Sequence, residues 1–319
     1  MILLLPIIAL VAGFILIYLS ADVFTDNSAR IANIYKISPL IIGILIFGFG
    51  TSAPEMLVSG LAAFEGHPEL SVGNAFGSNI LNIALVLGVS AMIMPIKIEL
   101  QVIKKEWIYL MFVTLIAGLL LWDRHLGVMD GAILFGLLAV FLLYTFNESK
   151  KDHHEFDNLS SKINIDHKGR TWTIILISFI VLLVSAKLIV YGGTSLAVQF
   201  GVSDLIIGLT VVALGTSLPE LAVSITSAIK KQHAMVVGNI IGSNLFNTVG
   251  VLAIPGLISP FYIPEKLITR DYPFMVVLTT LIILFVASRK FSKESAISRL
   301  EGALFIIILF FYVYLLFWK

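Results

Sequence analysis

Residues 50–55 are GTSAPE, and residues 215–220 are GTSLPE. The flanking residues match at the same offset, because SPLIIG at 38–43 corresponds to SDLIIG at 203–208. Farther along the chain, GNAFGSNILN at 73–82 corresponds to GNIIGSNLFN at 238–247. Similarity at one constant spacing is the signature of an internal repeat. We therefore predict that residues 38–88 and 203–253 are two copies of one duplicated element.

The composition places this duplicated chain in a lipid bilayer. Of its 319 residues, 58% are hydrophobic and 13% are charged, and the mean hydropathy is +1.00. A soluble protein of this composition would expose large apolar patches. The formal net charge of +1 gives no basic surface for nucleic acid. The absence of cysteine excludes disulfides, cysteine-bound metals and thiol catalysis.

The hydropathy pattern predicts an all-α membrane protein. A helix that crosses about 30 Å of hydrocarbon needs about 20 mostly apolar residues, and by this measure we expect about ten transmembrane helices. Their expected limits are 2–19, 39–64, 70–94, 107–122, 131–146, 172–198, 205–229, 234–258, 272–287 and 302–317. The hydrophilic stretch 147–170 is predicted to be a linker between a first five-helix repeat at 1–146 and a second at 171–319.

The basic residues predict how the chain is oriented. Most of the 21 lysines and arginines fall in alternate loops, and basic residues in short loops stay on the cytoplasmic side. We expect both termini to lie outside and the linker 147–170 to be cytoplasmic. Because each repeat has an odd number of spans, the two copies are predicted to be inverted. Inverted repeats are typical of secondary transporters, whose site lies at the repeat interface.

Two glutamates lie inside these apolar segments, Glu55 in the first copy and Glu220 in the second. An ionisable side chain at membrane depth costs several kcal/mol unless it is partnered or hydrated. Pro54 and Pro219 directly precede them, and proline kinks or breaks a helix because it lacks an amide donor. Carbonyl groups freed at such a break can bind hard cations. We predict that the two glutamates form one cation site.

Neutral oxygen atoms recur beside the glutamates. Thr51 and Ser52 lie within one turn of Glu55, and on the next predicted span Ser78 and Asn82 are one helical turn apart. Ser243 and Asn247 repeat that spacing in the second copy. A ligand set of oxygens, without thiol or imidazole, favours Na⁺, Ca²⁺ or another hard cation. A single hydroxyl in a membrane helix more often bonds its own backbone, so the duplication carries the argument.

Other features have simpler interpretations. The GxxxG spacing of Gly73 with Gly77 and of Gly238 with Gly242 predicts close helix packing. The short segment 65–69, with two glutamates and a histidine, is interpreted as a solvated external loop. For Lys187, inside the predicted span 172–198, snorkelling to the interface and a functional role both remain open.

The repeated motifs resemble the alpha repeats of the cation/Ca²⁺ antiporter superfamily, whose sodium/calcium exchanger branch carries G-T-S-x-P-E followed by G-S-N-x-x-[ND]. The resemblance covers nearly the whole chain and is greatest to compact prokaryotic members. It implies a Na⁺/Ca²⁺ antiporter without an organic cofactor, working as a monomer in the cell membrane. It implies that the transported ions are held by Glu55, Glu220, Thr51, Ser52, Thr216, Ser217, Ser78, Asn82, Ser243 and Asn247, with backbone carbonyls of Gly48 and Ala213.

One position departs from some members of that family. Asn247 stands where some exchangers carry aspartate, so the ionised motif has a charge of about −2, which one Ca²⁺ neutralises and three Na⁺ exceed. The coupling ratio is therefore open, and an H⁺- or K⁺-coupled antiporter is the alternative. A passive channel is less favoured, because channels usually build acidic rings by oligomerisation. An intramembrane enzyme is disfavoured, because neither Ser52 nor Ser217 has a membrane-embedded base spaced to activate it.

Overall fold

The computed structural model describes residues 4–97, 100–151, 168–201, 213–287 and 296–317. Most of the predicted linker and the first part of the predicted span 205–229 lie outside these residues. The described chain consists of helices, four two-residue strands and the short turns that connect them. The first half contains α1 (Leu4–Tyr35), α2 (Pro39–Ile42), η1 (Gly43–Gly48), α3 (Phe49–Phe64), α4 (Pro68–Leu81), η2 (Asn82–Leu87), α5 (Gly88–Ile93), α6 (Leu100–Leu120) and α7 (Val128–Lys151), where η denotes a π-helix.

The second half follows the same order. It contains α8 (Lys168–Gln199), α10 (Ala213–Thr216), α11 (Leu218–Ile229), α12 (His233–Phe246), η7 (Asn247–Val251), α13 (Ala253–Ile258), η8 (Leu267–Asp271), α14 (Tyr272–Ala287) and α15 (Arg299–Phe317). Asn82 begins η2 and its repeat counterpart Asn247 begins η7. The repeat in sequence is thus accompanied by a repeat of an uncommon local structure.

Within the described residues, eight helical segments are long and apolar enough to cross a membrane. They are Leu4–Tyr35, Pro39–Phe64, Pro68–Ile93, Val128–Asn147, Lys168–Gln199, His233–Ile258, Leu267–Ala287 and Arg299–Leu316. The predicted spans at 107–122 and 205–229 fall on α6 and on α10 with α11, which are outside this set. The structure therefore confirms an all-helical membrane protein, and the count of ten spans stays a prediction.

The first helix is much longer than the sequence predicted. We expected a span over 2–19, whereas α1 runs for 32 residues to Tyr35. A helix of that length is about 48 Å long, well beyond the hydrocarbon thickness, so it must tilt or project. The helix continues past the expected limit, and the polar residues Ser20, Thr25 and Ser28 that follow it are buried within the protein.

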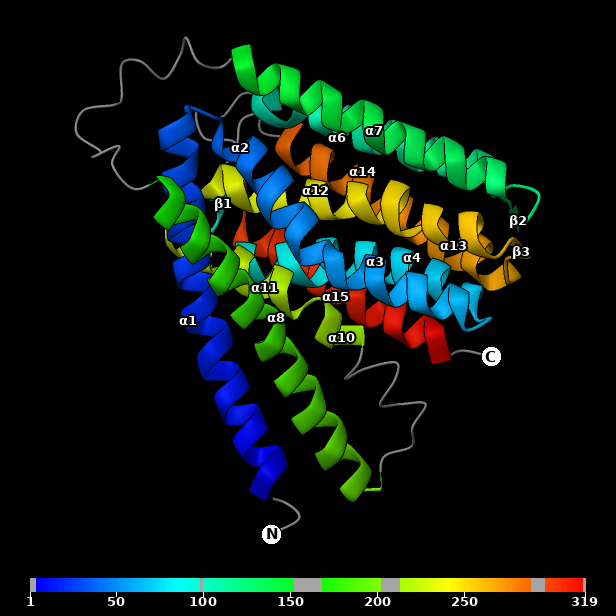
Figure 1. The fold of residues 1–319 in the computed structure, drawn as a ribbon. Helices are drawn as coiled ribbons and strands as arrows, with labels where there is room; N and C mark the ends of the chain where they lie inside the picture. The colour runs from blue at the N-terminus through cyan, green and yellow to red at the C-terminus, as the bar shows by residue number, and fades with distance from the viewer. Residues whose placement is uncertain (1–3, 98–99, 152–167, 202–212, 288–295, 318–319) are drawn as a thin grey trace.

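Helices α1 and α8 lie side by side and run obliquely to the other helices (Figure 1). Glycines permit this close approach, because a Cβ atom on Gly192 would meet the Pro6 carbonyl oxygen at 2.6 Å. A Cβ atom on Gly13 would likewise meet the Ile189 side chain at 2.7 Å. The pair therefore forms one layer that packs against the remaining bundle.

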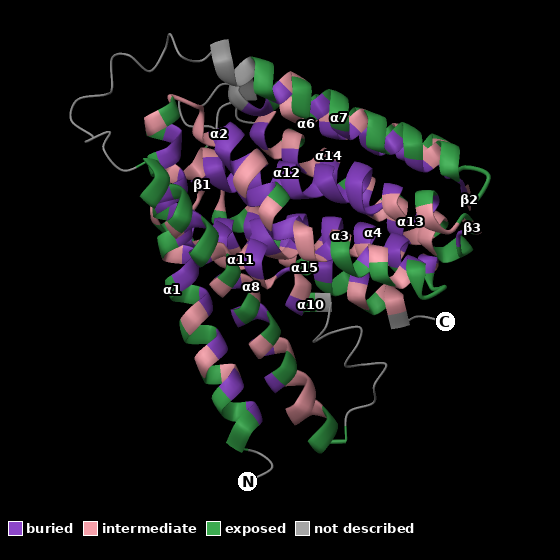
Figure 2. Cartoon of the chain, viewed as in Figure 1, coloured by how far each residue is buried: buried purple, intermediate pink, exposed green. Residues whose placement is uncertain are grey.

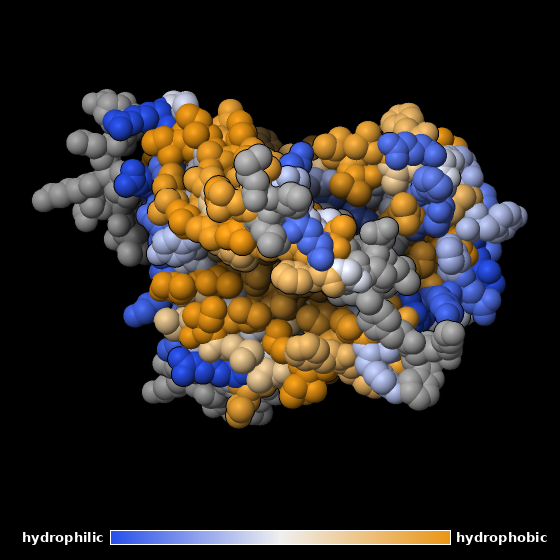
Figure 3. Space-filling view, turned by 90° about the horizontal axis from the view of Figure 1, so that it is seen from below, coloured by the Kyte–Doolittle hydropathy of each residue, from blue (hydrophilic) through white to orange (hydrophobic). Residues whose placement is uncertain are grey.

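The centre of the bundle is α12, and 89% of the His233–Ile258 window is buried inside the protein (Figure 2). It packs against α2 and η1 of the first half and against α11 of its own half. The outer helices α7 and α15 expose apolar side chains such as Phe135 and Phe310. Figure 3 shows one face with a broad apolar belt and hydrophilic residues at its two ends. Such a belt is the surface that lipid tails cover.

Two short antiparallel bridges join the halves at their ends. Strand β1 (Ile96–Lys97) pairs with β4 (Ala296–Ile297), and Ile96 lies opposite Ile297. Strand β2 (His125–Leu126) pairs with β3 (Phe261–Tyr262), and His125 lies opposite Tyr262. Each bridge links one half of the chain to the other, so the two repeats form a single interleaved core.

Candidate cation-binding site

Glu55 and Glu220 are both fully enclosed. Glu55 lies on α3 with 0% exposure, and Glu220 lies in the first turn of α11 with 1% exposure. All four carboxylate oxygens lack a hydrogen-bond partner. The two carboxylates are close enough for their charges to interact. Buried, unpaired and mutually repelling, they form a place where a cation would be strongly stabilised.

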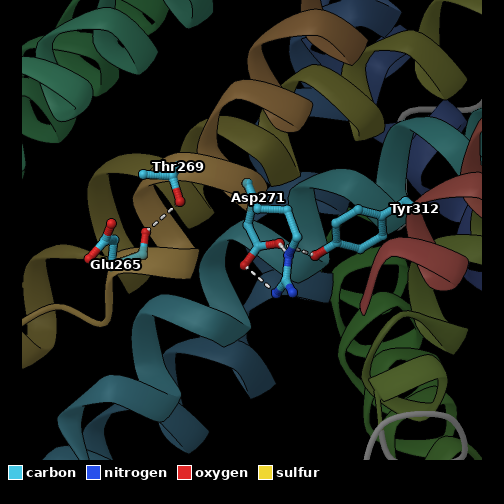
Figure 4. A network of polar contacts seen from close by, with 5 residues as sticks. Glu265, Thr269, Asp271 and Tyr312 are labelled. Carbon is cyan, nitrogen blue, oxygen red and sulfur yellow. Dashed lines mark hydrogen bonds and ion pairs between the residues drawn. The ribbon is translucent and has the colours of Figure 1, made fainter. Parts of the chain in front are cut away.

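The third buried carboxylate in the described chain shows a different arrangement. Asp271 is 2% exposed, and the Arg270 guanidinium donates to both of its oxygens at 2.7 and 3.0 Å. The Tyr312 hydroxyl donates to the same carboxylate at 2.9 Å (Figure 4). The buried carboxylate of Asp271 is thus neutralised by a cationic side chain and accepts hydrogen bonds from its own chain. Within the described part of the chain, the carboxylates of Glu55 and Glu220 have neither a cationic partner nor a hydrogen-bond donor.

The two prolines have different local effects. Ser217 interrupts the helix between α10 and α11, and Pro219 lies in the first turn of α11. The prediction of a break is therefore confirmed at Pro219. Pro54 instead lies inside α3, which continues past it to Phe64. There is thus no break at Pro54, and a kink there stays a prediction. The irregular part of this helix lies upstream, where the π-helix η1 ends at Gly48.

A cluster of polar groups from both repeats surrounds Thr51. Its hydroxyl donates to the Phe47 carbonyl at 2.9 Å and lies 3.3 Å from the Ser243 hydroxyl. Asn239 Oδ1 is 3.4 Å from the same Thr51 oxygen. Thr51 also lies beside the Glu220 carboxylate, whose oxygens nevertheless have no hydrogen-bond partner. The structure therefore brings Thr51, Ser243 and Glu220 together.

Glycine contacts between backbones hold this cluster together. A Cβ atom on Gly48 would meet the Gly242 backbone at 2.8 Å, and one on Gly242 would meet the Ile44 backbone at 2.8 Å. Gly43 and Gly238 are packed against each other in the same way. The close packing predicted from the spacing of Gly238 and Gly242 is confirmed. A Cβ atom on Gly73 or on Gly77 would meet nothing within 4 Å, so the structure does not show the close packing predicted for that pair. Most of the residues that correspond to its partners, 205–209, lie outside the described chain.

The same backbone contact brings the carbonyl of Gly48, a predicted ligand, close to Ser243. The Ser243 hydroxyl lies 3.5 Å from the Gly48 carbonyl oxygen, at the limit for a hydrogen bond. Gly48 is thus near Ser243 and Thr51, as expected. Ala213, its counterpart, begins α10.

Two asparagines were not among the predicted site residues and hold the glutamate backbones in place. The Asn74 amide donates to the Glu55 carbonyl at 3.2 Å and to the Ser59 hydroxyl at 3.3 Å. In the second repeat, the Asn239 amide donates to the Glu220 carbonyl at 3.3 Å and to the Ser224 hydroxyl at 2.9 Å. The signal for them was present, because both asparagines follow the repeated glycine of the GN pairs.

Four of the remaining predicted ligands are fully buried and make no hydrogen bond through their side chains. The hydroxyls of Ser52 and Ser217 and the amides of Asn82 and Asn247 have no hydrogen-bond partner. Asn82 begins η2, which packs against α11, and Asn247 begins η7, which packs against α3. Each asparagine therefore lies on an element facing the opposite glutamate helix. Ser78 is 4% exposed on α4, and Thr216 is half-buried at the end of α10.

Within the described residues, no three His, Cys, Asp or Glu side chains gather to hold a metal. The site has two carboxylates and a larger number of neutral oxygens. Such a set suits Na⁺ or Ca²⁺, which take oxygen ligands in flexible geometry, and is poor for Zn²⁺ or Cu²⁺.

Comparison with known proteins agrees with this chemistry. The family described as "Sodium/calcium exchanger protein" matches residues 5–147 and 170–318, one range in each half. The putative antiporter CaxA of Alkalimonas amylolytica is 38% identical over 97% of this chain and 98% of its own length. The inner membrane protein YrbG of Escherichia coli is 36% identical over 85% of each chain.

A solved structure matches along the same length. The sodium-calcium exchanger NCX_Mj, soaked with zero Na⁺ and Ca²⁺, superposes with a TM-score of 0.85 at 33% identity. The match covers 98% of this chain and 99% of that one. Both halves of the chain, its fold and its repeated acidic motif thus agree in assigning it to one group of membrane transporters, and the chain belongs to the sodium/calcium exchanger protein family.

Proposed function

We propose that this protein is a secondary antiporter that exchanges Na⁺ for Ca²⁺ by alternating access. The observation that carries the proposal is the pair of buried carboxylates, Glu55 and Glu220, which interact with each other and lack hydrogen bonds. The proposed site adds oxygens from both repeats, namely those of Thr51, Ser52, Ser78, Asn82, Thr216, Ser217, Ser243 and Asn247 and the carbonyls of Gly48 and Ala213. No organic cofactor is required.

Coupling follows from the cost of the empty site. With both glutamates ionised, the site has a charge of about −2, which Ca²⁺ or two Na⁺ would neutralise. To change between its two open states, the protein must pass through a closed state in which the site is surrounded by a low-dielectric interior. An empty site would keep its negative charge in that closed state, which costs several kcal/mol. The protein therefore changes state only when loaded, so that one ion moves out as the other moves in.

The proposed architecture is two inverted repeats of five helices each. Its support is the recurrence of local structure at one sequence offset. The hydrogen bonds of Asn74 to Glu55 and Ser59 recur as those of Asn239 to Glu220 and Ser224. The distribution of Lys and Arg supports external termini and a cytoplasmic linker at 147–170. The site is assembled within one chain, so we expect the monomer to be sufficient.

Two other functions compete with this proposal. An H⁺- or K⁺-coupled exchanger would use the same carboxylates, and Asn247 in place of an acid leaves the coupling ion to be measured. A passive channel would need an open path past the glutamates, whereas both are enclosed. The name of the relative CaxA, a putative antiporter, also favours exchange over passive flow.

The test uses purified protein in liposomes. Na⁺-loaded vesicles diluted into Na⁺-free buffer should accumulate ⁴⁵Ca²⁺, and vesicles loaded with K⁺ or set to an equal pH gradient should not. Uptake driven as well by H⁺ or K⁺ would identify the alternative coupling ion. Uptake that only dissipates a Ca²⁺ gradient, whatever the Na⁺ gradient, would indicate a channel.

The site itself is tested by Glu55→Gln and Glu220→Gln, which remove charge and keep shape. Each should abolish Na⁺-driven uptake, and undiminished transport by either variant would contradict the assigned site. Glu69→Gln is the matched control, because Glu69 is partly exposed and lies near His67 at the end of the molecule. It should transport at the rate of the unmodified protein.

A further inference from the structure

Helix α1 is tied to the end of α11 by an ion-pair clasp. The Lys230 ammonium lies 2.7 Å from a carboxylate oxygen of Asp22 and 2.7 Å from one of Asp26. It also donates to the Asp22 carbonyl at 3.1 Å. Partial burial alone would lower the pKa of Lys230, but its hydrogen bonds and charge interactions with the two aspartates outweigh burial and raise that pKa. Lys230 is therefore charged at physiological pH.

The repeat places an equivalent set of residues at the other end of the molecule. Ser20-Ala21-Asp22 on α1 corresponds at the repeat offset to Ser185-Ala186-Lys187 on α8. Lys230, which follows α11, corresponds to Glu65, which follows α3. Both positions are helix C-caps of the same conformation, with φ/ψ of −76°/3° at Lys230 and −80°/0° at Glu65. The next residue has positive φ in both copies, 59° at Lys231 and 85° at Gly66.

The signs of the charges are exchanged between the two sets. The first set joins an acid on the long helix α1 to a base after α11. The second set would join a base on the long helix α8, Lys187, to an acid after α3, Glu65. An exchange of signs keeps the attraction in both pairs, which random surface substitution would not be expected to do.

The two pairs are in opposite states in this structure. Lys230 and Asp22 are joined, whereas Glu65 and Lys187 are both exposed and form no ion pair with each other. The packing of the helices agrees, because α1 packs along α11 and the corresponding packing of α8 along α3 is much smaller. The long helices are thus joined to the core at Lys230, whereas at the other end Glu65 and Lys187 are not joined.

We propose that the clasp of Lys230 with Asp22 and Asp26 and the pair of Glu65 with Lys187 are two alternating latches, one for each side of the membrane. The inference rests on the alternating access proposed above. When α1 and α8 move together against the core, one latch opens as the other closes. The lysine-rich segment at 230–231 marks its latch as cytoplasmic, so this structure has the site closed to the cytoplasm.

The ion pairs of the clasp are weak enough for the latch to open again. Ion pairs at half-exposed sites, such as the side chains of Asp22 and Asp26 at 42% and 51% exposure, shift an equilibrium by about two- to fivefold each. A latch of that strength biases two states without trapping either, and ion binding can still decide the direction.

The experiment uses the absence of native cysteine. One variant carries Asp22→Cys with Lys230→Cys, and a second carries Lys187→Cys with Glu65→Cys. Each is treated with a short, reducible bifunctional thiol reagent under a series of Na⁺ and Ca²⁺ concentrations. Conditions that raise cross-linking of the first pair should lower that of the second. Efficient cross-linking of both under one condition, or none of the second under any, would overturn the proposal.

Charge variants provide a second measurement that does not depend on cysteine chemistry. Glu65→Lys places two lysines opposite each other and should slow exchange about fivefold. Adding Lys187→Glu restores an attractive pair and should restore the rate. Glu69→Lys, in the first turn of the next helix α4, is the matched control and should leave the rate unchanged. Failure of the double variant to recover, with protein still folded, would argue against the outer latch.

Failure of the latches can be separated from failure of the proposed exchange. Cross-linking is read on a gel and does not require knowledge of the transported ion. If Glu55→Gln still transports but the two cross-links remain mutually exclusive, the site assignment fails and the latches stand. If Na⁺-driven Ca²⁺ uptake is normal and both pairs cross-link together, only the latches fail.

Discussion

The hydroxyl groups of Thr51 and Ser243 lie 3.3 Å apart, although 192 residues separate them in the chain. Thr51 belongs to the helix that carries Glu55, and Ser243 belongs to α12 of the other half. Asn239, one turn before Ser243, holds the backbone of Glu220. The contact therefore links the two acidic motifs through a polar path in the interior of the membrane domain. Four predictions follow the arrangement outward from this point.

The backbone contact beneath the hydroxyl pair should be intolerant of any side chain. In Gly242→Ala, the new Cβ atom would meet the Ile44 backbone at 2.8 Å, and backbone cannot rotate aside. We expect a loss of about 1–3 kcal/mol of stability together with a strong loss of transport. Gly136→Ala on α7 is the control, because nothing lies within 4 Å of its added Cβ atom. Thermal unfolding in detergent and ⁴⁵Ca²⁺ uptake would measure both effects, and equal behaviour of the two variants would refute this account.

Asn239 should affect ion affinity more than folding. Asn239→Ala removes two donated hydrogen bonds, to the Glu220 carbonyl and the Ser224 hydroxyl. Each is worth about 0.5–1.5 kcal/mol, so we expect the half-saturating Ca²⁺ concentration to rise about tenfold. Asn74→Ala should produce a similar change from the first repeat. The prediction is contradicted if both variants keep normal Ca²⁺ saturation curves.

The Arg270, Asp271 and Tyr312 cluster should be structural. Tyr312→Phe removes a donor to a buried carboxylate and should lower stability by about 1.5–3 kcal/mol. Because this cluster has its own cation, transport at saturating ions should remain near normal below the unfolding temperature. Tyr18→Phe on the exposed face of α1 is the control. A large loss of Ca²⁺ affinity in Tyr312→Phe at unchanged stability would show that the cluster belongs to the ion site.

Charge at position 247 should set the response to voltage. With a site charge of about −2, the protein loaded with Ca²⁺ or with two Na⁺ is neutral. Exchange by the unmodified protein should therefore respond little to an imposed membrane potential. Asn247→Asp adds one negative charge, and its exchange should become voltage-dependent.

The unmodified protein and Asn247→Asp would be compared by measuring ⁴⁵Ca²⁺ uptake into liposomes at several membrane potentials, each imposed by a K⁺ diffusion gradient. Asn247→Ser, which adds no charge, is the control and should remain insensitive to voltage. A strong voltage response by the unmodified protein would instead indicate that more than two Na⁺ move for each Ca²⁺.

Errors in the sequence-based predictions arose where tertiary contacts decide local structure. The polar residues after position 19 suggested the end of the first span, but α1 buries Ser20, Thr25 and Ser28 inside the protein and continues to Tyr35. Pro54 suggested a broken helix, but α3 continues past it, and the irregular π-helix η1 lies upstream. Asn74 and Asn239 were visible in the repeat, yet only the coordinates assign them their partners.

From the residues alone we could predict that the chain is helical, that it lies in a membrane and that it contains two copies of one acidic motif. Hydropathy and repeat spacing are properties of neighbouring residues, so they can be recognised without a fold. Only the tertiary structure decided that the copies interleave, with α12 of one half against η1 of the other. That contact depends on backbones approaching at Gly48 and Gly242, which is a matter of shape between distant segments. The same packing brings Glu55 and Glu220 within range of each other's charge.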